Sequence, residues 1–267
     1  MKVLVAIPTY NEVENVPLIT ARLRKEVPEA DILIADDNSP DGTGKVADEL
    51  AAQDGHIQVL HRPGKAGLGA AYVAAFHWGL ERGYEVIVEF DADGSHRPED
   101  LPKLLEALSA GADVAKGSRW VKGGEVVNWP LSREVLSRGG NLWTRLWLGI
   151  PVKDATGGFA AWRATTLRGI DLTSVEAAGY GFQVDLAWKA YRAGFRIVEV
   201  PITFEERQLG ASKMSGNIVA EALVLTTKWG LKYRLGQAGE LGRKAAAQTA
   251  SGARWLADRL DEVARKP

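Results

Sequence analysis

Short apolar runs alternate with longer segments of helical period over the first 118 residues of the chain. Apolar residues recur at three- and four-residue intervals between the runs, as at Val16, Ile19 and Leu23, which is the spacing of one helix face. Five runs rich in Val and Ile have the length of a buried strand, namely Val3 to Pro8, Ile32 to Asp36, Ile57 to His61, Val86 to Asp91 and Val114 to Ser118. This order predicts an α/β domain in which helices connect parallel strands.

The pattern changes after Ser118. Residues 119–163 are rich in Gly and Trp, and residues 131–150 combine Leu and Trp with three arginines, as an amphipathic basic helix does. Further on, Phe182 to Ala193 predicts a helix, Arg196 to Phe204 a strand, and Ile218 to Leu235 an apolar helix. We therefore expect one α/β domain over residues 1–216 and a helical extension over residues 217–267.

Composition narrows the classes of function. The chain has 33 basic and 34 acidic residues and a formal net charge of −1, so no overall positive charge attracts nucleic acid. It contains no cysteine, which excludes disulfides, thiolate metal ligands and a cysteine nucleophile. No run approaches the ~18 apolar residues that a membrane-spanning helix needs, and residues 1–8 lack the features of a signal peptide. We expect a cytoplasmic protein that does not bind nucleic acid.

Carboxylates follow two of the predicted strands. Asp91-Ala92-Asp93 ends one strand and Asp36-Asp37 another, and open α/β sheets bind ligands at the carboxyl ends of their strands. Strand alternation points Asp91 and Asp93 to the same side, where two carboxylates can hold a hard divalent cation that neutralises a diphosphate. Both stretches also suit a turn before a helix, so the pattern alone leaves the two interpretations open.

Other motifs are ambiguous when taken singly. The stretch from Gly64 to Gly69 opens a helix, and its backbone amides can hold an anion, although it matches no standard phosphate loop. Arg207 and Lys213 lie on a stretch with Gly and Ser that suits either a loop closing over phosphates or a solvated loop. The pair Trp143 and Trp147 indicates core packing or, beside the neighbouring arginines, contact with lipid.

The order and spacing of these motifs resemble the family 2 glycosyltransferases of GT-A fold, and among them the dolichyl- or polyprenyl-phosphate mannosyltransferases. The resemblance rests on eight stretches: residues 8–12, 36–43, 62–72, 91–96, 117–120, 137–141, 156–159 and 207–213. It implies a Rossmann-like, mostly parallel sheet flanked by helices, with a C-terminal helical extension.

The resemblance also implies the reaction. The expected reaction is an inverting, metal-dependent transfer of mannose from GDP-mannose to a polyprenyl monophosphate, with Mg²⁺ or Mn²⁺ as cofactor. The product, polyprenyl-phosphate mannose, would serve as a lipid-linked mannose donor for glycolipids of the cell envelope. Such a transfer needs the leaving diphosphate stabilised, whereas the ionised acceptor phosphate needs no strong general base.

Site residues follow from the resemblance by position. Positions that hold the guanosine are matched by Pro8, Tyr10, Glu12, Ala35 and Asp37. The metal and diphosphate positions are matched by Asp91, Ala92 and Asp93, with Ser95 where relatives often have Gln as a further metal-side group. Phosphate-contacting positions of the nucleotide sugar are matched by Arg119, Arg207 and Lys213. The acceptor phosphate would meet Arg119, Arg133 and Ser137. The expected catalytic residues are Asp91, Asp93 and Arg119.

Alternatives stay open at this level. A related transferase could move glucose from UDP-glucose to the same lipid, a nucleotidyltransferase would release pyrophosphate, and a non-enzymatic module would only bind lipid or a partner. Because the expected acceptor is a membrane lipid, we expect the protein at the inner face of the plasma membrane. It would bind there peripherally, through its own amphipathic surface or through a membrane-spanning partner protein.

Overall fold

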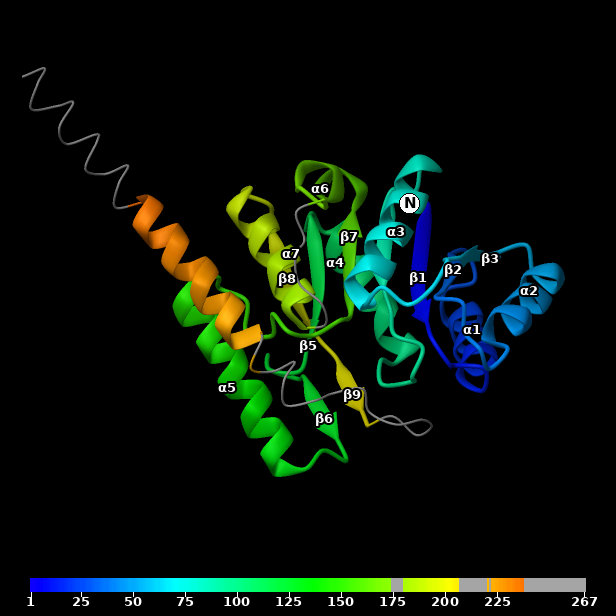
Figure 1. Ribbon diagram of the computed structural model, residues 1–267, viewed down its shortest axis with the longest axis horizontal. Helices are drawn as coiled ribbons and strands as arrows, with labels where there is room; N and C mark the ends of the chain where they lie inside the picture. The colour runs from blue at the N-terminus through cyan, green and yellow to red at the C-terminus, as the bar shows by residue number, and fades with distance from the viewer. Residues whose placement is uncertain (174–179, 207–219, 221, 238–267) are drawn as a thin grey trace, which may run out of the picture. The chain divides into compact units, whose positions relative to one another are not determined.

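A seven-stranded sheet organises the first 226 residues of the computed structural model, which describes residues 1–173, 180–206, 220 and 222–237 (Figure 1). Along the sheet the strands follow the order β3-β2-β1-β4-β7-β5-β8. They are β1 (Val3–Thr9), β2 (Asp31–Asp36), β3 (Ile57–His61), β4 (Val86–Glu89), β5 (Val114–Ser118), β7 (Ala160–Arg163) and β8 (Ile197–Pro201). A small second sheet pairs β6 (Glu125–Val127) with β9 (Thr203–Glu205). All five predicted apolar runs are confirmed as strands.

Most neighbouring strands are parallel, as the alternating pattern predicts. The pairs β1–β2, β1–β4, β2–β3 and β5–β8 are parallel, whereas β7 runs antiparallel to both β4 and β5. The carboxyl ends of β1, β2 and β4 therefore meet at one edge of the sheet.

Helices cover both faces of the sheet (Figure 1). They are α1 (Asn15–Glu26), α2 (Thr43–Gln53), α3 (Leu68–Glu81), α4 (Leu101–Ser109), α5 (Leu131–Leu148), α6 (Ala164–Gly169) and α7 (Tyr180–Arg192), with a 3₁₀ turn at Pro98–Asp100. Because side chains alternate along β1, Val5 packs with Leu23 of α1 and Leu104 of α4, whereas Leu4 belongs to the cluster that holds Phe76 of α3 and Phe182 of α7. The two clusters are the two halves of a three-layer α/β/α core.

The chain leaves the sheet after β5 and returns as β7. Between them lie β6 and α5, the amphipathic helix that the arginine- and leucine-containing pattern predicts. The two ends of this excursion are adjacent, because the Gly117 N–H donates to the Phe159 carbonyl at 2.8 Å. The predicted domain boundary, between 216 and 217, lies outside the described residues.

The structure divides the chain into two compact units, residues 1–226 and 227–267. Of the second unit the structure describes residues 227–237, which are helical. Among all described residues, no helix combines the length and the apolar character needed to cross a membrane.

Candidate active site

The carboxyl ends of β1 and β2 bring together residues predicted to hold a nucleoside. Pro8 and Ala35 are register partners across the two strands. The Asp37 N–H donates to the last carbonyl of β1 at 3.0 Å. The Lys65 ammonium, on the loop before α3, lies 4.4 Å from the centre of the Tyr10 ring. Four of the five predicted nucleoside residues thus gather at one sheet edge.

Two carboxylates of this edge are held by neighbouring side chains. Asp37 is 5% exposed and forms an ion pair with Arg62. Burial raises the pKa of Asp37, and the Arg62 guanidinium opposes that rise. Glu12, the fifth predicted residue, accepts a hydrogen bond from Asn15 Nδ2 at 2.7 Å, and its N–H donates to Thr43 Oγ1 at 2.9 Å. The backbone and side chains around this edge are therefore well fixed.

The carboxylates Asp91 and Asp93 follow β4 at the same edge. The Tyr72 hydroxyl donates to Asp91 Oδ1 at 2.9 Å, and the Ser95 N–H donates to Asp93 Oδ1 at 2.9 Å. The Asp91 N–H donates to Nδ1 of His96, which is 1% exposed, at 3.3 Å. These contacts fix the loop after β4, with Ala92 buried between the two aspartates.

The residues present fit a hard divalent cation that shares its coordination with substrate. Mg²⁺ prefers oxygen ligands and is commonly held by one or two carboxylates together with substrate phosphates. Among the described residues, no cluster of three or more His, Asp or Glu side chains can hold a metal unaided. A site in which Asp91 and Asp93 supply two ligands and a substrate diphosphate supplies the others agrees with this preference of Mg²⁺ and with the lack of a larger cluster among the described residues. Ser95 is buried beside Asp93, and its role toward a metal stays a prediction.

Arg119, the first residue after β5, is held by a buried carboxylate. Its Nε donates to Asp154 Oδ2 at 2.7 Å and its Nη2 to Asp154 Oδ1 at 2.6 Å, and Nη2 also donates to Thr156 Oγ1 at 3.2 Å. The Arg119 and Asp154 side chains are 6% and 0% exposed. Burial alone would raise the pKa of Asp154, but the Arg119 guanidinium holds it below its ordinary value. This two-point contact fixes the plane of the guanidinium.

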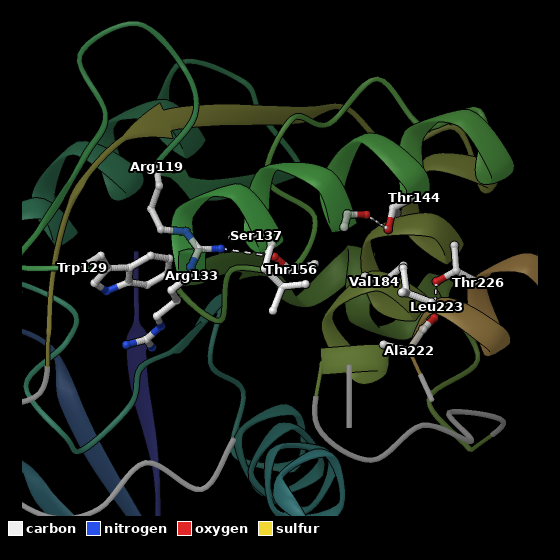
Figure 2. A pocket seen from close by; sticks show the side chains of 12 residues that line it. Arg119, Trp129, Arg133, Ser137, Thr144, Thr156, Val184, Ala222, Leu223 and Thr226 are labelled. Carbon is white, nitrogen blue, oxygen red and sulfur yellow. Dashed lines mark hydrogen bonds between the residues drawn. The ribbon is translucent and has the colours of Figure 1, made fainter. Parts of the chain in front are cut away.

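A pocket with a cationic end and an apolar end lies next to Arg119 (Figure 2). The cationic end is lined by Arg119, Arg133, Ser137 and Thr156, beside Trp129. The other end is lined by Thr144, Val184, Ala222, Leu223 and Thr226. Leu136 and Gly140 of α5 complete the lining. The three residues predicted to receive the acceptor phosphate therefore meet in one pocket whose character changes along its length.

Arg133 and Ser137 both lie at the cationic end of the pocket, but of their side chains only that of Arg133 has partners in the described structure. The Arg133 guanidinium lies 4.1 Å from the centre of the Trp129 ring and donates to Glu206 Oε1 at 3.1 Å. The Ser137 Oγ is buried and has no hydrogen-bond partner in the part of the chain that the structure describes. Buried hydroxyls usually have a partner, so this one is suited to a ligand.

A buried polar network lies within the sheet beside the site. Glu89 of β4 and Lys116 of β5 are both 0% exposed. Glu89 accepts hydrogen bonds from Trp162 Nε1 at 2.7 Å and from Gln183 Nε2 of α7, and Lys116 Nζ donates to the Gly157 carbonyl at 2.5 Å. Burial raises the pKa of Glu89 to about 7, although the Lys116 cation opposes the rise.

Sequence reasoning assigned no role to Asp154, Glu89 or Gln183. A polar residue beside the apolar face of a predicted helix is a signal that could have revealed Gln183, which lies next to Phe182 in the helix face that Leu186 continues. Asp154 has no such signal, since it lies in an irregular segment. The predicted phosphate-contacting residues Arg207 and Lys213 lie outside the described residues.

A sheet of this topology, with paired aspartates after a central strand and an amphiphilic pocket beside them, has the architecture of a GT-A fold. A solved structure of glucosyl-3-phosphoglycerate synthase from Mycobacterium tuberculosis, in complex with Mn²⁺ and uridine-diphosphate-glucose, shares this fold. Its TM-score is 0.63 at 19% identity, over 85% of this chain and 77% of that one. Residues 4–170 match the model of glycosyl transferase family 2, and the chain belongs to that family.

Curated relatives are similar over nearly the whole chain. The chain is 59% identical over 234 residues to the undecaprenyl-phosphate mannosyltransferase of Micrococcus luteus, covering 88% of this chain and 96% of that protein. It is 55% identical over 238 residues to the polyprenol monophosphomannose synthase of Mycolicibacterium smegmatis, covering 89% of this chain and 90% of that protein. The predicted membership of the polyprenyl-phosphate mannosyltransferase group is thereby confirmed.

Proposed function

We propose that the protein transfers mannose from GDP-mannose to a polyprenyl monophosphate and forms polyprenyl-phosphate mannose. The pocket next to Arg119 carries this proposal, because its cationic and apolar ends match an acceptor with an anionic head and a hydrocarbon tail. Relatives at 59% and 55% identity, named for undecaprenyl-phosphate mannosyl transfer and polyprenol monophosphomannose synthesis, support mannose as the sugar and polyprenyl phosphate as the acceptor.

The acceptor phosphate acts as the nucleophile. Arg119, Arg133 and Ser137 bind it, and a phosphate oxygen attacks the anomeric carbon of mannose in line with the leaving GDP, so the anomeric configuration inverts. Because the phosphate monoester is already largely ionised near neutral pH, the enzyme contributes orientation rather than a general base. The guanidinium of Arg119, which Asp154 holds in one plane, suits this task, since a fixed cation forms strong charge-assisted hydrogen bonds with phosphate oxygens.

The donor lies at the sheet edge. Pro8, Tyr10, Glu12, Ala35 and Asp37 would surround the guanosine, and Asp91 and Asp93 would hold Mg²⁺ or Mn²⁺. The bound cation would act as a Lewis acid that stabilises the charge of the leaving diphosphate. A solved structure of the same fold was determined with Mn²⁺, which supports this class of cofactor. Arg207 and Lys213 are proposed to contact the donor phosphates from the chain that follows β9.

The decisive experiment offers the purified protein labelled GDP-mannose or labelled UDP-glucose with a short polyprenyl phosphate and Mg²⁺ or Mn²⁺. Transfer from GDP-mannose with release of GDP supports the proposal. Transfer only from UDP-glucose would change the sugar and keep the mechanism, whereas release of pyrophosphate would indicate a nucleotidyltransferase. The absence of any turnover together with metal-independent nucleotide binding would favour a non-enzymatic module.

Replacing Arg133 with alanine is expected to raise the KM for polyprenyl phosphate about 10- to 100-fold, because one charge-assisted hydrogen bond to the acceptor is lost. The KM for GDP-mannose should change little. Steady-state kinetics with each substrate varied in turn measures both values. Arg138→Ala is the matched control, since Arg138 lies on the same helix and its side chain is 55% exposed. Unchanged kinetics for Arg133→Ala would refute the acceptor assignment.

An exposed apolar stripe on α5 supports peripheral membrane binding. Leu131, Val135, Leu142 and Leu146 are all exposed, and a period of 3.6 residues places them within about 60° of each other around the helix. Trp143 is partly exposed beside them, and aromatic side chains favour the membrane interface. We propose that this stripe enters the interface while the pocket, which Leu136 of the same helix lines, receives the lipid acceptor.

Replacing both Leu142 and Leu146 with serine is expected to weaken binding to anionic vesicles at least about tenfold, because less apolar surface enters the interface. Flotation of the purified protein with phosphatidylglycerol-containing vesicles measures the bound fraction. Leu18→Ser is the matched control, because it removes a similarly exposed leucine from α1. If the wild-type protein does not float with vesicles, a membrane-spanning partner becomes the better explanation.

A further inference from the structure

A buried amide on α7 presents an oxygen without a partner. Gln183 is 3% exposed, and its Nε2 donates to Glu89 Oε2. Its Oε1 is buried and has no hydrogen-bond partner among the residues that the structure describes. Buried side-chain acceptors are nearly always satisfied in folded proteins, so this oxygen calls for a ligand.

The network around Glu89 determines which way the amide faces. A side-chain amide carries its donors on nitrogen and its acceptor lone pairs on oxygen. Because Nε2 is used by Glu89, and Trp162 Nε1 occupies the other Glu89 oxygen at 2.7 Å, Gln183 is held with Oε1 turned away from the carboxylate. Covalent geometry keeps Oε1 roughly 2.3 Å from Nε2, so the position of one atom locates the other closely.

The Gln183 amide lies between the acceptor pocket next to Arg119 and the aspartates that follow β4. A β-carbon placed on Gly158 would be 3.7 Å from Gln183 Nε2 and 3.4 Å from Asp91 Oδ2, so all three groups are neighbours. Two residues earlier in the same loop, Thr156 accepts a hydrogen bond from Arg119. The loop from Thr156 to Gly158 thus runs from the cationic end of the acceptor pocket to the aspartate that follows β4.

The transferred sugar must occupy the space between the acceptor pocket and these aspartates, because its anomeric carbon is bonded to the donor diphosphate and is attacked by the acceptor phosphate. We propose that Gln183 Oε1 accepts a hydrogen bond from a hydroxyl group of this sugar and so contributes to sugar selection. The inference rests on the proposed function and deepens it. Gln183 is the residue that touches the sugar, whereas Glu89 and Trp162 are positioning residues that fix the amide.

Such an arrangement explains why an amide is buried at this point of α7. A buried acceptor rejects a substrate that cannot donate to it, because the acceptor would then stay unsatisfied. The absence of a side chain at Gly158 keeps open the space beside Asp91 Oδ2. Sugar hydroxyls are the only uncharged donors that the proposed donor substrate brings to this position.

The test compares the affinities of GDP and GDP-mannose in the presence of Mn²⁺, measured by titration calorimetry on the wild-type protein and on Gln183→Met. Methionine has a similar length and removes both the donor and the acceptor. We expect the affinity for GDP to stay within about twofold, while the affinity for GDP-mannose and kcat/KM for mannosyl transfer fall roughly tenfold. A purely structural role would lower both affinities by the same factor, and that result would overturn the proposal.

A series of GDP-deoxymannoses identifies the hydroxyl. The wild-type protein should discriminate against each deoxy donor, but the penalty of Gln183→Met should vanish for the one donor that lacks the hydroxyl bound by Oε1. A penalty that is equal for every donor would refute the contact. If Gln183→Met does not fold, Gln183→Asn, which withdraws the amide by one methylene, is tested in the same way.

Gln53→Met is the matched control, because it makes the same substitution at an exposed glutamine at the end of α2. It should leave the affinities for both GDP and GDP-mannose unchanged. The proposed function has a separate outcome, since wild-type protein that transfers no mannose to polyprenyl phosphate would refute that function whatever the variants do. Wild-type transfer with unaltered sugar selectivity in Gln183→Met would refute only the role of Gln183.

Discussion

Replacing Asp93 with alanine is expected to lower kcat for mannosyl transfer at least ~1000-fold, because the site loses one of the two carboxylates proposed to hold the cation at the leaving diphosphate. Folding should be preserved, since the Asp93 side chain is only partly buried. Transfer of labelled mannose, measured over a range of Mn²⁺ concentrations, gives kcat and the apparent metal affinity. Chelation of the metal should abolish transfer by the wild-type protein as well.

Asp48→Ala is the control for this experiment. It removes the same charge from a side chain that is 56% exposed on α2, so it should leave kcat within about twofold. A turnover by Asp93→Ala close to that of the wild type would exclude this carboxylate from the metal site and would undermine the proposed mechanism.

Replacing Asp154 with asparagine is expected to lower the free energy of unfolding by about 3–5 kcal/mol, because Arg119 would stay buried with its charge unpaired. The same change should reduce mannosyl transfer, since the guanidinium plane is no longer fixed at two points. Urea denaturation at pH 7 measures the loss of stability. Glu49→Gln, which breaks an exposed ion pair with Lys45, is the control and should cost less than about 1 kcal/mol.

The Asp154–Arg119 pair also predicts how stability depends on pH. The folded pKa of Asp154 lies below its ordinary value of 3.8, so its contribution is complete above that value and is lost as the pH falls through the folded pKa. Asp154→Asn should therefore lose less stability than the wild type when both are taken from neutral to strongly acidic pH. An equal acid sensitivity of the two proteins would contradict the assignment.

The sheet was predictable because most of its strands are buried on both faces and connected by helices. Such strands appear as continuous apolar runs, which is why β1, β2, β4 and β5 could be placed from the pattern alone. β7 escaped prediction, since Ala160–Arg163 is four residues long, begins with two alanines and has no alternating pattern. Its antiparallel position between β4 and β5 depends on the order of strands in the finished sheet, which a local pattern does not contain.

The site was predictable to different degrees along its length. Asp37, Asp91 and Asp93 follow apolar strands, and the general rule for open sheets locates them together. Arg133 and Ser137 were assigned only through family resemblance, because an arginine on an amphipathic helix is usually a solvated charge. Gln183 and Asp154 find their partners through residues far away in sequence, so their positions became evident only in the folded chain.

We expect the segment between β5 and β7 to determine to a large extent which acceptor the protein can bind. It carries most of the residues that line the acceptor pocket, and its two ends are joined by the hydrogen bond from Gly117 to Phe159. A segment that starts and finishes at the same point can be exchanged without moving the strands that carry the donor residues. The segment from Arg119 to Gly158 thus starts and ends at one point of the sheet, and we expect that grafting its counterpart from another family member would redirect the sugar to a different lipid or soluble phosphate.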